Sequence, residues 1–107
     1  MSLNHEERTR TSHELAANLE RCGLDRETVA STLGFSTQRL GDTLRIDSAS
    51  DPADVWLLRD FLDRAIRDRG SDPEPWTVLT DAARTAASHW YNLHEAPPSP
   101  PTRGPHP

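Results

Sequence analysis

The chain has 107 residues, of which 34% are hydrophobic and 27% are charged, and its formal net charge is -5. We expect a single domain, because two units of half this size would each bury too little apolar surface to be stable. Proteins that bind nucleic acid mainly through phosphate neutralisation usually carry a basic surplus. The acidic balance therefore predicts weak non-specific binding to nucleic acid.

All twelve basic residues are arginine. We attribute this to coding bias, because no arginine stands in an obvious bidentate setting. Cys22 is the single cysteine, which excludes an intramolecular disulfide and a cysteine-based metal cluster and suits a reducing cytosol. No stretch approaches the length of apolar sequence that spans a membrane. We expect a soluble, cytoplasmic protein with no membrane partner.

The first helix is expected at about residues 12–22. Thr11 and Glu14 have the spacing of a capping box, in which each side chain bonds the backbone N–H group of the other residue. Gly23 ends this helix. Residues 1–10 have no apolar face, so we expect a frayed N-terminal arm, although Asn4 could cap an earlier turn.

Two short helices are expected next, separated by Gly34. Leu24 and Val29 flank an Asp25 cap in the register of a hydrophobic staple, and Phe35 repeats the pattern before the second helix. The expected bounds are residues 26–33 and 37–45.

The longest helix is expected at about residues 52–69. Asp51 caps it and Pro52 occupies its first position, and its apolar residues recur at helical spacing. Gly70 stops the helix, and a stiff proline-containing connector follows.

A last helix is expected from a Thr77 cap to about Leu93. Residues 96–107 are rich in proline and should be disordered or locally polyproline II, and we expect no ligand role for their PxxP spacings.

The expected fold class is all-α, because no segment alternates with period two over five or more residues. We expect about five helices in a domain covering residues 11–95. Its core is a helix-turn-helix at residues 25–45, most simply in a lambda-repressor-like arrangement.

A helix-turn-helix needs a small residue in its first helix, a glycine in the turn and apolar residues inside the second helix. Ala30 and Gly34 meet the first two requirements. Thr43 departs from the third, since it stands where a second inner apolar residue is expected. Gly41 costs the second helix roughly 0.5 to 1 kcal/mol relative to alanine.

The residues expected to contact DNA are Arg26, Ser36, Thr37, Gln38, Arg39 and Arg45. Gln38 could read adenine and Arg39 guanine through bidentate contacts. Asp42 counts against DNA, because a carboxylate is repelled by phosphates. The three acids between Asp25 and Arg45 cancel the three arginines, so this surface is neutral and would need a dimer partner or a basic arm.

The alternative is a protein–protein interaction module that reuses the helical unit and binds no DNA. Its possible contact surface is Trp56, Phe61 and Trp90. An exposed aromatic patch there would also support self-association. The other interpretation is that the three tryptophans, Trp76 included, fill the seam between the last two helices and the helix-turn-helix unit.

No nucleophile motif or glycine-rich phosphate loop occurs, so we expect no enzyme activity, no cofactor and no small-molecule substrate. His89 and His94 are five residues apart, which does not place them on one helical face. We expect no metal site. The expected function is a small DNA-binding homodimer that regulates transcription.

Several short stretches resemble, in order and spacing, a family of small bacterial proteins called domain of unknown function 2316. They are Met1–Asn4, Thr11–Leu15, Asn18, Gly23–Leu24, Asp54–Leu62 and Pro73–Leu79. The resemblance covers about residues 1–93. It implies a compact helical protein with a helix-turn-helix-like segment, and it implies no activity.

Overall fold

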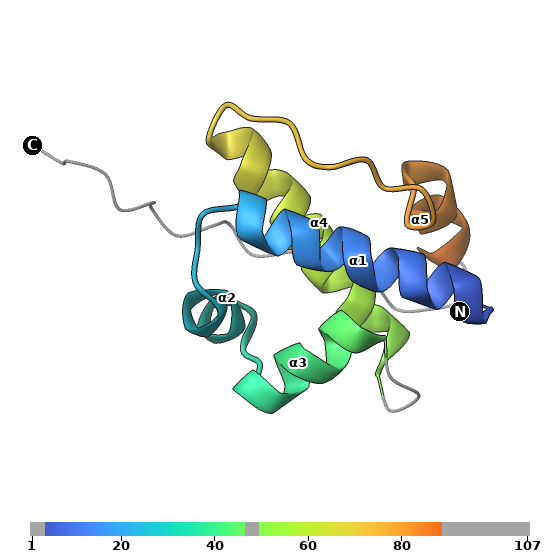
Figure 1. Cartoon of the computed structure of the whole chain (residues 1–107), viewed down its shortest axis with the longest axis horizontal. Coiled ribbons are helices and arrows are strands. Elements are labelled where there is room, and N and C mark those ends of the chain that lie inside the picture. Colours follow the sequence, from blue (N-terminus) through green and yellow to red (C-terminus); the bar gives the residue numbers. More distant parts are fainter. Residues whose placement is uncertain (1–3, 47–49, 89–107) are drawn as a thin grey trace, which may run out of the picture.

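The structure is a computed structural model that describes residues 4–46 and 50–88, and these residues form five α-helices and no strand. The helices are α1 (His5–Arg21), α2 (Arg26–Leu33), α3 (Thr37–Arg45), α4 (Pro52–Asp68) and α5 (Asp81–Ser88). Helix α1 packs on α3 and α4, while α2 joins the bundle chiefly through α3 (Figure 1). The all-α fold is confirmed for this part of the chain, and the lambda-repressor-like arrangement stays a prediction.

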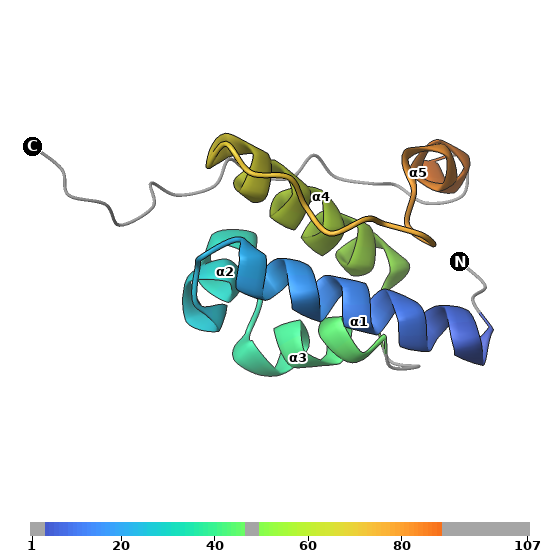
Figure 2. The same cartoon turned by 45° about the horizontal axis from the view of Figure 1, so that its top comes forward.

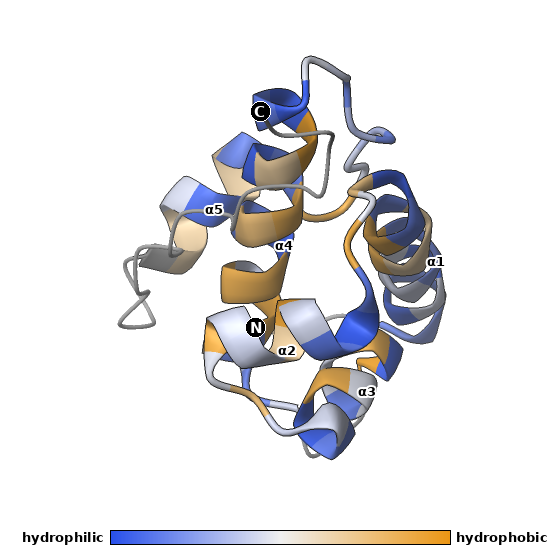
Figure 3. Cartoon of the chain, turned by 90° about the vertical axis from the view of Figure 1, so that its left-hand side faces the viewer, coloured by the Kyte–Doolittle hydropathy of each residue, from blue (hydrophilic) through white to orange (hydrophobic). Residues whose placement is uncertain are grey.

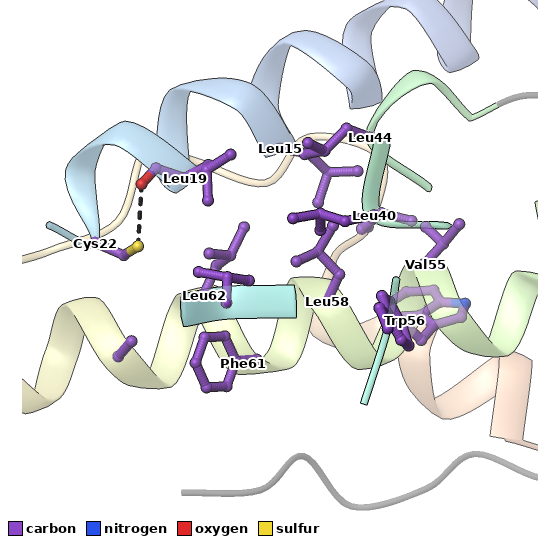
Figure 4. Close-up of a cluster of buried hydrophobic side chains, with 14 of the residues drawn as sticks. Leu15, Leu19, Cys22, Leu40, Leu44, Val55, Trp56, Leu58, Phe61 and Leu62 are labelled. Carbon is purple, nitrogen blue, oxygen red and sulfur yellow. Dashed lines mark hydrogen bonds between the residues drawn. The ribbon is translucent and has the colours of Figure 1, made fainter. Parts of the chain in front are cut away.

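The core lies between α1 and α4 because both helices carry apolar side chains at helical spacing. Leu58 and Leu62 of α4 and Leu15 of α1 are fully buried, and Leu19 nearly so. Figure 4 shows the two leucines of α1 and the two leucines of α4 pointing toward each other across the interface between these helices. Helix α4 has hydrophobic and hydrophilic stretches and lies in the middle of the bundle in Figure 3. It packs on α1 and α3.

The first helix begins earlier than predicted. Asn4 caps α1 by accepting a hydrogen bond from the backbone N–H group of Glu7 at 2.8 Å, and Glu7 returns a bond to the N–H group of Asn4. The predicted start near Ser12 is wrong, and so is the frayed arm for the part of residues 1–10 that is described. Thr11 is buried inside the helix, where its hydroxyl group donates to the carbonyl oxygen of Glu7.

The last helix begins later than predicted. Thr77 is no cap, because its N–H and hydroxyl groups donate to the carboxylate of Glu14 on α1, the former at 3.0 Å. Thr80 caps α5 instead, accepting from the N–H group of Ala83. The predicted end near Leu93 lies outside the described residues.

The connector between α4 and α5 returns along α1 and α4 (Figures 1 and 2). Asn18 is fully buried and pairs with the Glu74 backbone, accepting from its N–H group at 2.7 Å and donating to its carbonyl oxygen at 3.3 Å. Arg21 adds an ion pair to the Glu74 carboxylate. The first helix therefore fixes the path of a segment more than fifty residues away in the chain.

Cys22 is sealed at the end of α1. Its Sγ donates to the carbonyl oxygen of Leu19, and none of the side chain is exposed (Figure 4). Burial is the main cause that raises the pKa of the Cys22 thiol above its ordinary value. The unfolded chain loses the thiol proton near pH 8.5, whereas the folded state keeps it to a higher pH. The stabilisation from burying the neutral thiol is therefore complete below pH 8.5 and is lost as the pH rises above it.

Alkylation by iodoacetamide should therefore be slow in the native protein at pH 8 and fast in urea. The control is a variant with Cys22→Ala and Ser31→Cys, since Ser31 is exposed on α2. It should react rapidly without denaturant. Equal native rates for the two proteins would contradict the burial of Cys22.

Candidate nucleic-acid interface

The α2–turn–α3 unit has the predicted helix bounds. Asp25 caps α2 by accepting from the N–H group of Thr28 at 2.7 Å, and Ser36 caps α3 by accepting from the N–H group of Arg39 at 3.0 Å. Hydrogen bonding with the Thr28 side chain, and secondarily with its backbone, lowers the pKa of the Asp25 carboxyl. Gly34 adopts a φ of 75° between the helices, a conformation that side-chain-bearing residues rarely hold. Local caps and this turn therefore set the shape of the unit.

The inner face of α3 is more completely packed than its sequence suggested. Leu40 is fully buried, Leu44 is nearly so, and Thr43 is buried between them. The Thr43 hydroxyl group donates to the carbonyl oxygen of Arg39 at 2.7 Å, so the buried polar group is satisfied. A threonine can therefore occupy the position where an apolar residue was expected.

The residues predicted to contact DNA all lie exposed on α2 and α3 or in the turn between them. They are Arg26, Ser36, Thr37, Gln38, Arg39 and Arg45. Gln38 is the second residue of α3, in its first turn, and is exposed to solvent. The structure brings the six residues to one unit, and their contact with DNA stays a prediction.

Arg39 makes a bidentate ion pair that the sequence did not reveal. Its Nε and Nη2 donate to the two carboxylate oxygens of Asp54 on α4 at 2.8 and 2.7 Å. The guanidinium group also lies 4.3 Å from the ring centroid of Phe35. These hydrogen bonds raise the pKa of Arg39. The statement that no arginine has a bidentate setting is wrong, because the partner is supplied by tertiary structure.

Arg26 and Arg45 approach the same side of α3 above Gly41. A Cβ atom built on Gly41 would lie 3.3 Å from Nη1 of Arg45 and 3.9 Å from Nη2 of Arg26. Arg45 is paired with Asp42, whereas Arg26 makes no ion pair within the described residues. Both guanidinium groups therefore lie close to Gly41, and the missing Cβ atom leaves space for that of Arg45.

Acidic side chains limit the positive charge of this face. Asp42, Asp51 and Asp54 line a hollow of about 320 Å³ together with Gln38 and Arg39. Arg39 is the one basic residue among the described residues that line this hollow, so the hollow is more acidic than the neutral balance predicted for residues 25–45. Any phosphate would have to approach on the side of Arg26 and Arg45.

Two of the three residues of the alternative contact surface are buried. Trp56 is 2% exposed and Phe61 is fully buried, so neither is available to a partner on the surface of the chain. The prediction of an exposed patch is wrong for them, because α4 turns both into the core. Trp90 lies outside the described residues.

A second polar cluster, which sequence reasoning missed, joins α4 to the connector. Arg59 is 6% exposed and donates to the carbonyl oxygen of Leu79 and to the carboxylates of Asp60 and Asp81. Its guanidinium group lies 5.4 Å from the ring centroid of Trp76. A hollow of about 400 Å³ lies beside them. No local sequence signal marks Arg59, because it looks like one more charge on the polar face of a helix.

None of the helices in the described ranges is both long and apolar enough to cross a membrane. A search of curated proteins and a search of solved structures gave no match to this chain. The family model described as "Uncharacterized protein conserved in bacteria (DUF2316)" matches residues 1–92. The resemblance seen in the sequence is thereby confirmed, and the chain belongs to the DUF2316 family.

Proposed function

We propose that this protein is a small helix-turn-helix DNA-binding protein that regulates transcription. The observation that carries the proposal is the convergence of Arg26 and Arg45 above Gly41 on the same unit that exposes Gln38 and Arg39. In DNA-bound helix-turn-helix proteins, phosphate contacts lie beside the residues that reach base edges, and this resemblance supports the proposal.

The two arginines are suited to phosphate because they repel each other in the free protein. Asp42 offsets the charge of Arg45 only, and Arg26 keeps its charge exposed. A phosphate group between them would accept hydrogen bonds from both guanidinium groups and remove the repulsion. The interaction would be weak without further contacts, since the face carries three acids.

Homodimerisation and a cytoplasmic location remain part of this proposal. Two copies would present two α3 helices to successive major grooves, about 34 Å apart, and would double the few phosphate contacts of one chain. Sedimentation of the protein with and without DNA would test the dimer.

The protein–protein interaction module is the weaker candidate. It was motivated by the acidic charge and by Asp42, and two residues of its expected contact surface, Trp56 and Phe61, are buried. The acidic charge still favours it, but charge alone names no partner.

The test of the proposal is DNA affinity as a function of salt. Fluorescence anisotropy with random-sequence duplexes should give a slope of log K against log[salt] that becomes shallower by about 2 when Arg26 and Arg45 are both changed to alanine, because two phosphate contacts are lost. The measurement should be made between 20 and about 200 mM salt, where such slopes are well defined.

The matched control is the double variant Arg64→Ala, Arg67→Ala. Both residues are exposed on α4, away from the α2–α3 unit, and their removal changes the net charge by the same amount. Its slope should equal that of the wild type. Equal losses in the two double variants, or no binding by the wild type at low salt, would refute the proposed function.

A further inference from the structure

We infer that Asp54 is a positioning residue for base recognition: it holds Arg39 so that the outer edge of the guanidinium group faces a guanine in the DNA major groove. The inference rests on the proposed function and extends it to a residue of α4, outside the helix-turn-helix unit.

The hydrogen bonds divide the guanidinium group into two edges. The inner edge, Nε and one N–H group of Nη2, is occupied by Asp54 at 2.8 and 2.7 Å. The outer edge consists of Nη1 and the second N–H group of Nη2, and it has no partner among the described residues. Guanine offers O6 and N7 to just such a pair of parallel donors.

The exposed fractions show which group of the pair meets solvent. The Arg39 side chain is 50% exposed, whereas that of Asp54 is 12% exposed. A base would therefore meet the guanidinium group and not the carboxylate. If the pair served only to attach α3 to α4, nothing would require the arginine to remain half exposed.

Two further contacts restrict the orientation of Arg39. The Phe35 ring lies under the guanidinium group at 4.3 Å from its centroid, and Asp54 lies in the first turn of α4, a rigid helix. An arginine fixed on two sides loses less conformational entropy on binding than a free one. Fixing it also selects guanine, because the donors cannot turn to suit another base.

The net charge of the Arg39–Asp54 ion pair indicates a role in base recognition and not in phosphate binding. Asp54 offsets the positive charge of Arg39, so the pair adds little to the attraction for phosphate, which is left to Arg26 and Arg45. Loss of Asp54 should therefore change base preference more than overall affinity.

The experiment selects preferred sites from a randomised duplex pool for four proteins: wild type, Arg39→Lys, Asp54→Asn and Asp51→Asn. Asp51→Asn is the matched control. It removes one carboxylate from the same hollow, it keeps a good helix cap, and Asp51 makes no hydrogen bond to Arg39. Asp54→Asn offers one acceptor in place of two and sets an amide donor against the arginine fork.

The wild type should prefer guanine to adenine at one position by about 10- to 100-fold. Asp51→Asn should keep that preference. Arg39→Lys and Asp54→Asn should both reduce it to about threefold or less, while non-specific affinity in Asp54→Asn is unchanged or higher because an acid is gone. Replacing that guanine with 7-deazaguanine, which lacks N7, should weaken only the wild type and Asp51→Asn.

A guanine preference that survives in folded Asp54→Asn, or is sharpened there, would overturn the inference and leave the proposed function standing. The inference would also be overturned if the site preferred by the wild type contains no guanine and its recognition still depends on Arg39. Absence of any DNA binding by the wild type would overturn both. Asp54→Ser serves as a second carboxylate-free variant if Asp54→Asn melts below the assay temperature.

Discussion

Phe61→Ala is expected to lower the free energy of unfolding by about 3–5 kcal/mol, because it removes a large buried side chain and leaves a cavity. Phe61 is 0% exposed on α4 and belongs to the main hydrophobic cluster. Urea unfolding followed by circular dichroism would measure the change. In a domain this small, a loss of that size approaches the total stability, so partial unfolding at 37 °C is also expected.

Leu57→Ala provides the comparison for Phe61→Ala. Leu57 lies on the same helix but is only partly buried, and it should cost less than about 1.5 kcal/mol. Should Phe61→Ala prove as mild as Leu57→Ala, Phe61 would be a surface residue, and the interaction-module hypothesis would regain its contact surface.

Arg59→Ala is expected to cost about 2–4 kcal/mol, because the change removes a buried cation that satisfies several polar groups at once. The carbonyl oxygen of Leu79 loses its donor, and Asp60 keeps an ion pair with Arg84. Asp81 is exposed and can be hydrated. Thermal unfolding followed by circular dichroism would measure the stability, and the indole NMR signal of Trp76 would report the local order of the connector.

Arg84→Ala is the control for Arg59→Ala. It removes an arginine from the same Asp60 carboxylate, but Arg84 is more exposed and makes a single ion pair there. It should cost less than about 1 kcal/mol. A stability loss in Arg59→Ala no larger than in this control would show that Arg59 does not anchor the connector.

The bounds of α2, α3 and the start of α4 could be predicted from the sequence because their signals are local. Each cap acts on a backbone N–H group two or three residues away, and Gly34 supplies the turn by its own conformational freedom. Nothing distant has to be known to place these elements.

The residues at which α1 and α5 begin could not be predicted, because distant residues decide between competing N-terminal caps. Thr11 and Thr77 both stand at plausible cap positions, but Glu14 bonds Thr77 instead of serving Thr11. Asn4 and Thr80 then become the caps. Sequence spacing alone cannot distinguish a residue that caps a helix in the folded protein from a residue that bonds a distant partner instead.

The candidate site was predicted as a set of exposed residues, but its internal geometry was not. The pairing of Arg39 with Asp54 spans two helices, and the position of the Arg26 and Arg45 side chains beside Gly41 depends on how α2 packs against α3. Neither follows from spacing along one helix. The same limit explains why Trp56 and Phe61 were open to two interpretations.

An NMR titration of the ¹⁵N-labelled protein with random-sequence duplex DNA would show whether the α2–α3 unit binds DNA. At low salt the largest amide shifts should occur at Thr37, Gln38, Gly41 and Arg45, while the Trp76 indole signal stays in place. Largest shifts on the connector around Trp76, or no shifts at any residue, would contradict DNA binding by the α2–α3 unit.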